Sequence, residues 1–263
     1  MSKLSVYILA YNEEPKVEAA IKSVTWADEV IVVDSGSTDK TARISKKLGA
    51  KVVEAPFEGF GRLRNMAIAA CKNEWIFSLD ADERCTPGAA EEIKSIIGKA
   101  HPFDAYYVPR RNWFMGKWIR HSGWYPDYRQ PQLFKRETLI FHDEDEVHEG
   151  YEIIGTTGYL KNPIWQFPFK NFAQLQNKAN RYSSLGAVKL QRRKVRGGMT
   201  KALCHAVGAF LRIYFLERGF LDGWAGFVIA LGNFEGTFYR YAKLTEIRLR
   251  WDRPPADHNL NLP

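Results

Sequence analysis

The stretch IFSLDADERCTPG (residues 76–88) is an apolar run that ends abruptly in the carboxylates of Asp80, Asp82 and Glu83. In a strand, residues two apart point to the same side, so a strand ending here can direct Asp80 and Asp82 toward one point while Ala81 faces away. Like charges this close are costly unless a cation lies beside them. Carboxylate oxygens suit Mg²⁺ or Mn²⁺, which bind one or two carboxylates together with substrate phosphates. The stretch therefore predicts a divalent-metal site that accepts a diphosphate.

The same carboxylates also fit a solvated turn that leads into a helix. Thr86 would then be the N-cap and Pro87 the first helical residue. A lone pair of aspartates usually has this simpler explanation. The sequence of the neighbouring strands distinguishes the metal site from the solvated turn.

Short β-branched runs alternate with helical patterns through the first half of the chain. Apolar runs at residues 5–9, 29–34, 51–55 and 74–80 are separated by helical patterns at residues 15–25, 40–48 and 61–70. This alternation predicts βαβ units, and hence an α/β domain whose mostly parallel sheet is covered by helices on both faces.

Ligands of such sheets bind at the carboxyl ends of the strands. Those ends read AYNEE (10–14), VDSGSTD (33–39) and LDADE (79–83), so this edge is polar and acidic. No GxGxxG follows the first strand and no GxxxxGK[ST] occurs, which disfavours dinucleotide-binding and P-loop functions.

Composition favours one sizeable α/β domain with an appendage. The chain has 263 residues, 45% of them hydrophobic, and three scattered cysteines that we interpret as reduced thiols of a cytoplasmic protein. The N-terminal residues lack a cleavage site and predict a first strand rather than a signal peptide.

Residues 181–253 hold 14 Lys or Arg against 5 Asp or Glu, a local charge of +9, which leaves −1 for the rest of the chain. Such a bias predicts a polyanionic neighbour, which would be either nucleic acid or an anionic membrane surface. The alternative is a basic face that is simply solvated.

The pattern becomes helical past residue 171, so we expect one domain at residues 1–170 and a basic, amphipathic helical region at residues 171–263. Apolar residues recur there at steps of three and four: Phe220, Trp224, Phe227, Val228, Leu231, Phe234, Phe238 and Tyr241. Packing against the first domain or a sister subunit would cover this stripe. Basic flanks at Arg192, Arg193, Lys194 and Arg196 also suit an interfacial membrane helix. No apolar run approaches the roughly 20 residues that span a bilayer, so the sequence predicts a protein peripheral on the inner face of the cytoplasmic membrane.

Four of these motifs together resemble, in order and spacing, the nucleotide-sugar domain of family 2 glycosyltransferases: AYNEE, VVDSGSTD (32–39), RLRNMA (62–67) and LDADE. GWYPDYRQPQLFKR (123–136), DEVHEG (145–150) and GFLDGWAGF (219–227) are similar to the bacterial subgroup that adds β-glucose to the lipopolysaccharide inner core. The resemblance covers nearly the whole chain. It implies a GT-A fold, a UDP-sugar donor, a divalent metal, a lipid-linked lipopolysaccharide-core acceptor, and inversion at the anomeric carbon.

The resemblance also implies roles for individual residues. Asp34 is similar to the aspartate that accepts the uracil N3–H, and Arg64 to a residue beside the donor, where its guanidinium could pair with phosphate or simply be solvated. The other residues implied for the donor are Ala10, Tyr11, Asn12, Glu13, Ser35, Asp39, Asn65, Asp80, Ala81, Tyr128, Arg129 and Gln132. Several of these are also ordinary turn formers and loop caps. Tyr128, Arg129 and Gln132 could hold either sugar, and Trp113, Trp118 and Trp124 could stack on pyranose faces or pack in the core.

The reaction needs stabilisation of the departing UDP and a base that takes the proton of the acceptor hydroxyl. The metal on Asp82, with Asp80, would supply the first. Glu149 is the first candidate for the base, with Asp145 and Asp127 as rivals. We interpret His148 as a metal or diphosphate contact, with a structural histidine as the alternative.

Three other functions remain open from the sequence. A transferase for another surface glycan or a protein acceptor would share these motifs. A sugar nucleotidyltransferase would require a glycine-rich N-terminal loop where this chain has AYNEE, and a nucleic-acid-binding module would require a signature that is missing. The identity of the sugar depends on pocket shape rather than on motifs.

Overall fold

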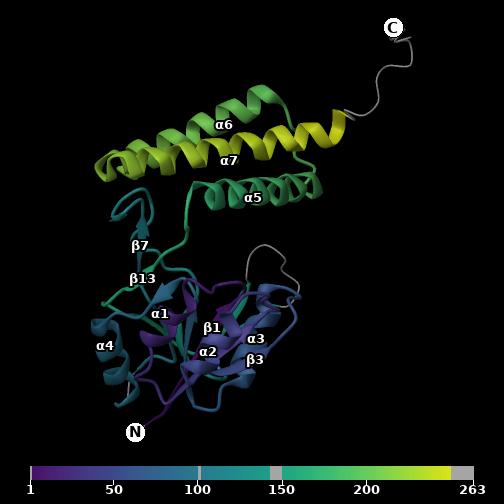
Figure 1. The fold of residues 1–263 in the computed structure, drawn as a ribbon. Helices are drawn as coiled ribbons and strands as arrows, with labels where there is room; N and C mark the ends of the chain where they lie inside the picture. The colour runs from purple at the N-terminus through teal and green to yellow at the C-terminus, as the bar shows by residue number, and fades with distance from the viewer. Residues whose placement is uncertain (1, 100–101, 143–149, 250–263) are drawn as a thin grey trace. The chain divides into compact units, whose positions relative to one another are not determined.

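The computed structural model describes residues 2–99, 102–142 and 150–249. These residues form two compact units (Figure 1). Unit 1 consists of residues up to 120 together with residues 124–168, and unit 2 of residues 121–123 together with those from 169 onward. The short segment 121–123 belongs to unit 2 although it is separated from the rest of that unit in sequence.

Unit 1 is built on a seven-stranded sheet in the order β12-β6-β9-β4-β1-β2-β3. Its strands are β1 (Leu4–Ala10), β2 (Glu29–Asp34), β3 (Lys51–Glu54), β4 (Trp75–Asp80), β6 (Ala105–Tyr107), β9 (Leu133–Lys135) and β12 (Thr157–Tyr159). β1 pairs in parallel with β2 and β4, and β2 pairs in parallel with β3. β9 is antiparallel to both β4 and β6. The predicted mostly parallel sheet is confirmed, with one antiparallel strand inserted.

Helices cover both faces of this sheet (Figure 1). They are α1 (Val17–Lys22), α2 (Thr41–Lys47), α3 (Phe60–Ala70) and α4 (Pro87–Ile97). Val6 and Ile8 of β1 pack in one core with α1 and α4, while Tyr7 and Leu9 pack in a second core with α3. Because both faces are covered, successive residues of β1 are all buried, which explains why its sequence is apolar except for Ser5.

Two smaller sheets complete unit 1. One has the order β5-β13-β7-β8, formed by β5 (Glu83–Arg84), β13 (Ile164–Gln166), β7 (Arg110–Phe114) and β8 (Lys117–Trp118). The other pairs β10 (Leu139–Phe141) with β11 (Tyr151–Ile153). Thr86 caps α4 by accepting a hydrogen bond from the backbone N–H of Ala89 at 3.1 Å, and Pro87 is its first residue, as the alternative interpretation of this stretch predicts.

Unit 2 is helical, with α5 (Phe172–Arg192), α6 (Met199–Leu211), the π-helical turn η1 (Arg212–Leu216), the 3₁₀ turn η2 (Gly219–Asp222) and α7 (Trp224–Leu249). Within this unit α7 lies between α5 and α6 and packs against both (Figure 1). Asp222 is buried and accepts hydrogen bonds from the backbone N–H of His121 at 3.0 Å and the hydroxyl of Ser122 at 2.9 Å. These bonds explain why residues 121–123 belong to unit 2. None of the helices described is long and apolar enough to cross a membrane.

Candidate active site

The carboxyl ends of four parallel strands meet at one edge of the large sheet. In the register of the sheet Ala10 pairs with Asp34, Asp34 with Glu54, and Leu9 with Asp80. Three carboxylates from three strands therefore lie along this edge. The sequence motifs predict two of them, Asp34 and Asp80.

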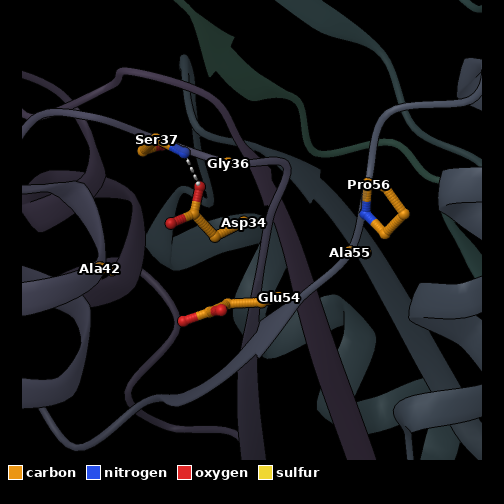
Figure 2. Close-up of a pocket in the computed structure, with 7 residues that line it drawn as sticks. All are labelled: Asp34, Gly36, Ser37, Ala42, Glu54, Ala55 and Pro56. Atoms are coloured by element: carbon orange, nitrogen blue, oxygen red, sulfur yellow. Dashed lines mark hydrogen bonds between the residues drawn. The ribbon is translucent and has the colours of Figure 1, made fainter.

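A pocket of about 450 Å³ opens at the ends of β2 and β3, and its lining residues are Asp34, Gly36, Ser37, Ala42, Glu54, Ala55 and Pro56 (Figure 2). Asp34 is only 3% exposed, and its Oδ1 accepts a hydrogen bond from the backbone N–H of Ser37 at 2.9 Å. The carboxylates of Asp34 and Glu54 point to the same side in Figure 2. Two acceptor-only groups make this a pocket for N–H and O–H donors and a poor one for phosphate.

The loops after β1 and β2 are fastened to each other by side chains predicted to bind the donor. The carboxamide oxygen of Asn12 accepts hydrogen bonds from the backbone N–H groups of Thr38 at 2.9 Å and Asp39 at 3.3 Å. The Asp39 carboxylate accepts from the backbone N–H groups of Glu14 at 3.0 Å and Thr41 at 2.9 Å. Asn12 and Asp39 thus act as the loop caps that the sequence left as an alternative.

Four further predicted residues lie at the end of β1 or on the same loops. The backbone N–H of Ser35 donates to the Ala10 carbonyl at 3.0 Å, and the backbone N–H of Glu13 donates to the Thr41 hydroxyl at 2.9 Å. Tyr11 is 59% exposed beside them. Ala10, Tyr11, Glu13 and Ser35 therefore line the edge, mainly through their backbone.

The acidic turn after β4 differs from the geometry that the sequence suggests. β4 ends at Asp80, and Ala81 and Asp82 form a turn before β5 begins at Glu83. The alternation of a strand therefore does not extend to Asp82, and the pleat argument that directs Asp80 and Asp82 to one point is wrong. Ala81 is buried, and its backbone N–H donates to the Leu9 carbonyl at 3.2 Å.

A buried guanidinium lies beside Asp80. Arg64 is 3% exposed, and it donates to Asp80 Oδ1 at 3.3 Å and to the Ser78 hydroxyl at 3.2 Å. Its guanidinium also lies over the ring of Phe141, 5.6 Å from the centroid. The alternative of a merely solvated arginine is wrong, because Arg64 offsets the negative charge of the turn from below the surface.

Asn65, the next residue of α3, makes two hydrogen bonds to the backbone of Phe141. Its amide nitrogen donates to the Phe141 carbonyl at 2.8 Å, and its amide oxygen accepts from the Phe141 N–H at 3.1 Å. This pair of bonds fastens β10 to α3.

The third carboxylate of the turn belongs to the interior. Glu83 is fully buried and accepts hydrogen bonds from Arg110 Nε at 2.6 Å, Gln132 Nε2 at 2.9 Å and the backbone N–H of Asp80 at 3.0 Å. Burial raises the pKa of Glu83, and the facing guanidinium of Arg110 opposes that shift. Gln132, predicted to hold a sugar, is 1% exposed and also donates to the Ser78 carbonyl at 3.1 Å. Glu83 and Gln132 therefore hold the turn in place.

Asp127 and Arg129 form a two-pronged ion pair. Arg129 donates to Asp127 Oδ2 at 2.7 Å and to Oδ1 at 3.3 Å. Burial acts to lower the pKa of Arg129, but the facing Asp127 carboxylate raises it above its ordinary value. The Asp127 backbone carbonyl accepts from Arg110 at 2.9 Å, which connects this loop to Glu83. Tyr128 is exposed and packs edge-on against Tyr159, with centroids 4.9 Å apart.

The three tryptophans proposed to stack on sugars all pack against protein side chains. Trp113 contacts Trp165 edge-on at 5.7 Å, and Trp124 contacts Phe114 at 5.5 Å, both between centroids. The Trp118 ring has guanidinium carbons of two arginines within 5 Å of its centroid, at 4.6 and 4.5 Å. This arrangement favours the packing alternative, although Trp113 remains 39% exposed.

Asp145, His148 and Glu149 lie outside the described residues. Within the described ranges, no group of three or more His, Cys, Asp or Glu side chains could hold a metal ion. Asp80 and Asp82 are both partly exposed and offer only carboxylate oxygens. They therefore fit Mg²⁺ or Mn²⁺, which complete their shell with waters and substrate phosphates.

Sequence reasoning missed Glu54 and the small residues of the pocket. A signal existed, because β3 is a parallel strand whose carboxyl end reads VEAP (residues 53–56) at the same edge. Glu83 offered no such signal. A charge in an acidic run usually lies in solvent, and its partner Arg110 is 27 residues away.

Comparison with known proteins identifies relatives of this chain. The profile described as Glycosyl transferase family 2 matches residues 5–158. An uncharacterized glycosyltransferase of Rickettsia typhi is 31% identical over 261 residues, covering 95% of this chain and 89% of that protein. The lipopolysaccharide core biosynthesis glycosyltransferase LpsC of Rhizobium meliloti is 26% identical, covering 98% and 97%. A solved structure, glucosyl-3-phosphoglycerate synthase from Mycobacterium tuberculosis with Mn²⁺, UDP and glucosyl-3-phosphoglycerate, is 27% identical over 42% of this chain and 44% of that chain, with a TM-score of 0.38.

Proposed function

This chain belongs to glycosyl transferase family 2, and we propose that it transfers a hexose from a UDP-sugar to a lipopolysaccharide-core acceptor with inversion at the anomeric carbon. The observation that carries the donor assignment is the acidic pocket at the ends of β2 and β3. LpsC, similar over nearly the full length of both chains, supports the acceptor class. Glucose is the first candidate for the hexose, on the resemblance of residues 123–136 to the subgroup that adds β-glucose.

The pocket favours uridine because its two carboxylates can accept hydrogen bonds from N–H and O–H groups. Ser37 N–H occupies Oδ1 of Asp34, which leaves Oδ2 for a donor in the pocket. Uracil carries an N–H at N3, and ribose carries hydroxyls that could donate to Glu54. A phosphate here would meet two negative charges, so the diphosphate lies outside this pocket, toward the acidic turn.

At that turn, Asp80 and Asp82 would hold a divalent cation, which when bound neutralises charge on the diphosphate leaving group. Arg64 fixes Asp80 through Oδ1, and Glu83 fixes the Asp80 backbone N–H, so the turn is held in place before donor binds.

The acceptor hydroxyl oxygen attacks C1 as the bond from C1 to the diphosphate oxygen breaks, and a base takes the hydroxyl proton. Asp127 is poorly suited to be that base, because both of its carboxylate oxygens accept hydrogen bonds from Arg129. Glu149 remains the first candidate for the base, with Asp145 as its rival.

Asp34→Asn tests the donor assignment sharply. Ser37 N–H keeps the amide oxygen on its side, so the amide N–H₂ would face the pocket and oppose the uracil N3–H. We expect calorimetry to show UDP affinity lowered about ten- to a hundredfold, as for loss of a charged hydrogen bond. Cytosine N3 is an acceptor, so the preference for UDP over CDP should shrink or reverse.

Glu54→Gln is the matched control, because it changes a carboxylate of the same pocket without opposing N3–H. It should leave the UDP to CDP preference nearly unchanged. An unaltered preference in Asp34→Asn would contradict the uridine assignment. Wild-type protein that transfers no hexose from UDP-glucose to a purified lipopolysaccharide core would contradict the proposed reaction.

A further inference from the structure

Helix α6 and the turn η1 that follows it present a row of apolar side chains to solvent. Met199, Leu203, Val207, Leu211 and Phe215 follow one another at intervals of four residues, and each is between 42% and 55% exposed. We refer to these five residues as the α6 stripe. On its other side α6 buries only small side chains, Ala202 and Ala206, before Ile213. Apart from the half-buried Phe210, the larger apolar residues of this helix are therefore exposed.

An apolar cluster continues the stripe where α6 ends. Leu216 in η1 and Trp224 at the start of α7 are each 79% exposed, and Leu221 in η2 is 53% exposed. We refer to these three residues as the end cluster. Exposed apolar groups that gather in one place mark an interaction surface, and tryptophan is typical of the boundary between apolar and aqueous phases.

The charge around this surface is mostly positive. Residues 172–216, which include α5 and α6, contain nine Lys or Arg and no Asp or Glu. Arg192, at the end of α5, is exposed, as are Arg193, Lys194 and Arg196 in the link that precedes α6, and Lys201 lies on α6 itself. The first carboxylate after this run is Glu217, which pairs with Arg212 at 3.4 Å.

We propose that the α6 stripe and the end cluster dock unit 2 on the surface of an anionic lipid bilayer. A helix with an exposed apolar flank and basic neighbours lies in the membrane interface, where anionic headgroups attract the charges and the acyl region takes the side chains. A second copy of this face would bring two basic surfaces together, which disfavours self-association. Nucleic acid would satisfy the charges but would leave the leucines of the stripe in water.

This surface differs from the stripe that the sequence suggests. Of the eight residues in that predicted stripe, five on α7 are half-buried, in line with the packing alternative: Phe227, Val228, Phe234, Phe238 and Tyr241. The other three, Phe220, Trp224 and Leu231, are exposed, and Trp224 belongs to the end cluster as well. The proposal does not depend on the identity of the donor or acceptor. It places an attachment surface in unit 2, whereas the residues of the candidate active site belong to unit 1.

Flotation of the full chain with vesicles tests the proposal. Wild-type protein should float with vesicles of phosphatidylglycerol and phosphatidylethanolamine, and only weakly with pure phosphatidylcholine. Leu211→Ser/Phe215→Ser should lower partitioning about tenfold or more, because each serine removes an apolar side chain from the interface. Val188→Ser is the matched control, since Val188 is an exposed apolar residue on α5, across α7 from α6, and it should partition as wild type does.

Cys204 provides a second readout without any substitution. It is exposed on α6, whereas Cys71 and Cys85 are buried, and burial raises the pKa of both their thiols to about 12. A polarity-sensitive maleimide dye should therefore label Cys204 selectively. Its emission should shift to the blue when anionic vesicles are added, and added salt should reduce the shift.

Three results would overturn the proposal: equal binding to neutral vesicles, wild-type partitioning of the double variant, or an unchanged dye spectrum on vesicles that bind the protein. A dimer in sedimentation that the double variant abolishes would instead assign the surface to a second copy. UDP affinity of the double variant should equal that of wild type, so failure of this test is distinguishable from failure of the proposed reaction.

Discussion

Arg110→Met should destabilise unit 1 because it leaves Glu83 buried without a counter-charge. Both side chains are 1% exposed, and Arg110 Nε lies 2.6 Å from Glu83 Oε1. Removing one partner of such a pair typically costs about 3–5 kcal/mol, which is a large part of the about 5–15 kcal/mol that stabilises a domain. Methionine has a long apolar side chain, so lost volume contributes little to the expected effect.

The cost should depend on pH. Burial raises the pKa of Glu83 above its ordinary 4.5, and loss of Arg110 removes the charge that opposes this shift. The folded state would then bind the Glu83 proton more tightly than the unfolded chain does. This contribution to stability is present below about pH 4.5 and is lost as pH rises through the folded pKa, so the deficit of the variant should shrink as pH falls from about 8 to 5.

Urea unfolding followed by tryptophan fluorescence measures the effect, because six of the eight tryptophans belong to unit 1. Arg62→Met is the control: Arg62 forms an exposed pair with Glu58, so we expect a loss of about 0.5 kcal/mol or less. Adding Glu83→Gln to Arg110→Met should restore at least half of the lost stability. A double variant as unstable as Arg110→Met, or a deficit independent of pH, would refute the buried charge as the cause.

Three other substitutions test separate parts of the structure. Asp82→Ala should remove the Mn²⁺-dependent part of UDP affinity in calorimetry and leave the urea midpoint unchanged; full metal dependence would contradict the metal assignment. Glu149→Gln should slow single-turnover transfer about a hundred- to ten-thousandfold with UDP affinity near wild type, and normal turnover would exclude Glu149 as the base. Gly61→Ala would place a Cβ against the His142 carbonyl oxygen and should destabilise the fold by about 1–3 kcal/mol in urea unfolding. Gly232→Ala is the control, because its Cβ would meet nothing within 4 Å, and it should be neutral or stabilising in the same experiment.

The core of the large sheet could be predicted from the sequence because its strands are buried on both faces. A strand such as β1, with seven consecutive buried residues, leaves a nearly continuous apolar run that can be recognised without knowledge of the neighbouring strands. The insertion of β9 could not be predicted in this way. β9 has three residues, too few for a periodic signal, and its position between β4 and β6 depends on long-range pairing.

The candidate site was predictable in its location but less so in its roles. Parallel strands bring their carboxyl ends together, which is why Asp34 and Asp80 share an edge. Whether Asn12 contacts a ligand or caps a loop depends on which backbone N–H groups face it, and these come from Thr38 and Asp39 on another loop. The α6 stripe poses the same difficulty, since an apolar row on a helix predicts burial and only the packing shows that these side chains stay exposed among the described residues.

The three carboxylates of residues 79–83 differ in burial and in ion-pair partners, and two buried arginines account for the difference. Glu83 faces Arg110 in the interior, and Asp80 shares one oxygen with Arg64 at 3.3 Å while remaining 31% exposed. Asp82 follows in a half-buried turn. Charge compensation therefore comes from α3 and β7 on the protein side, which lets an acidic turn persist at the end of an apolar strand before any cation arrives. On this reasoning substitutions at Glu83 should act on stability, those at Asp82 on donor affinity, and those at Asp80 on both.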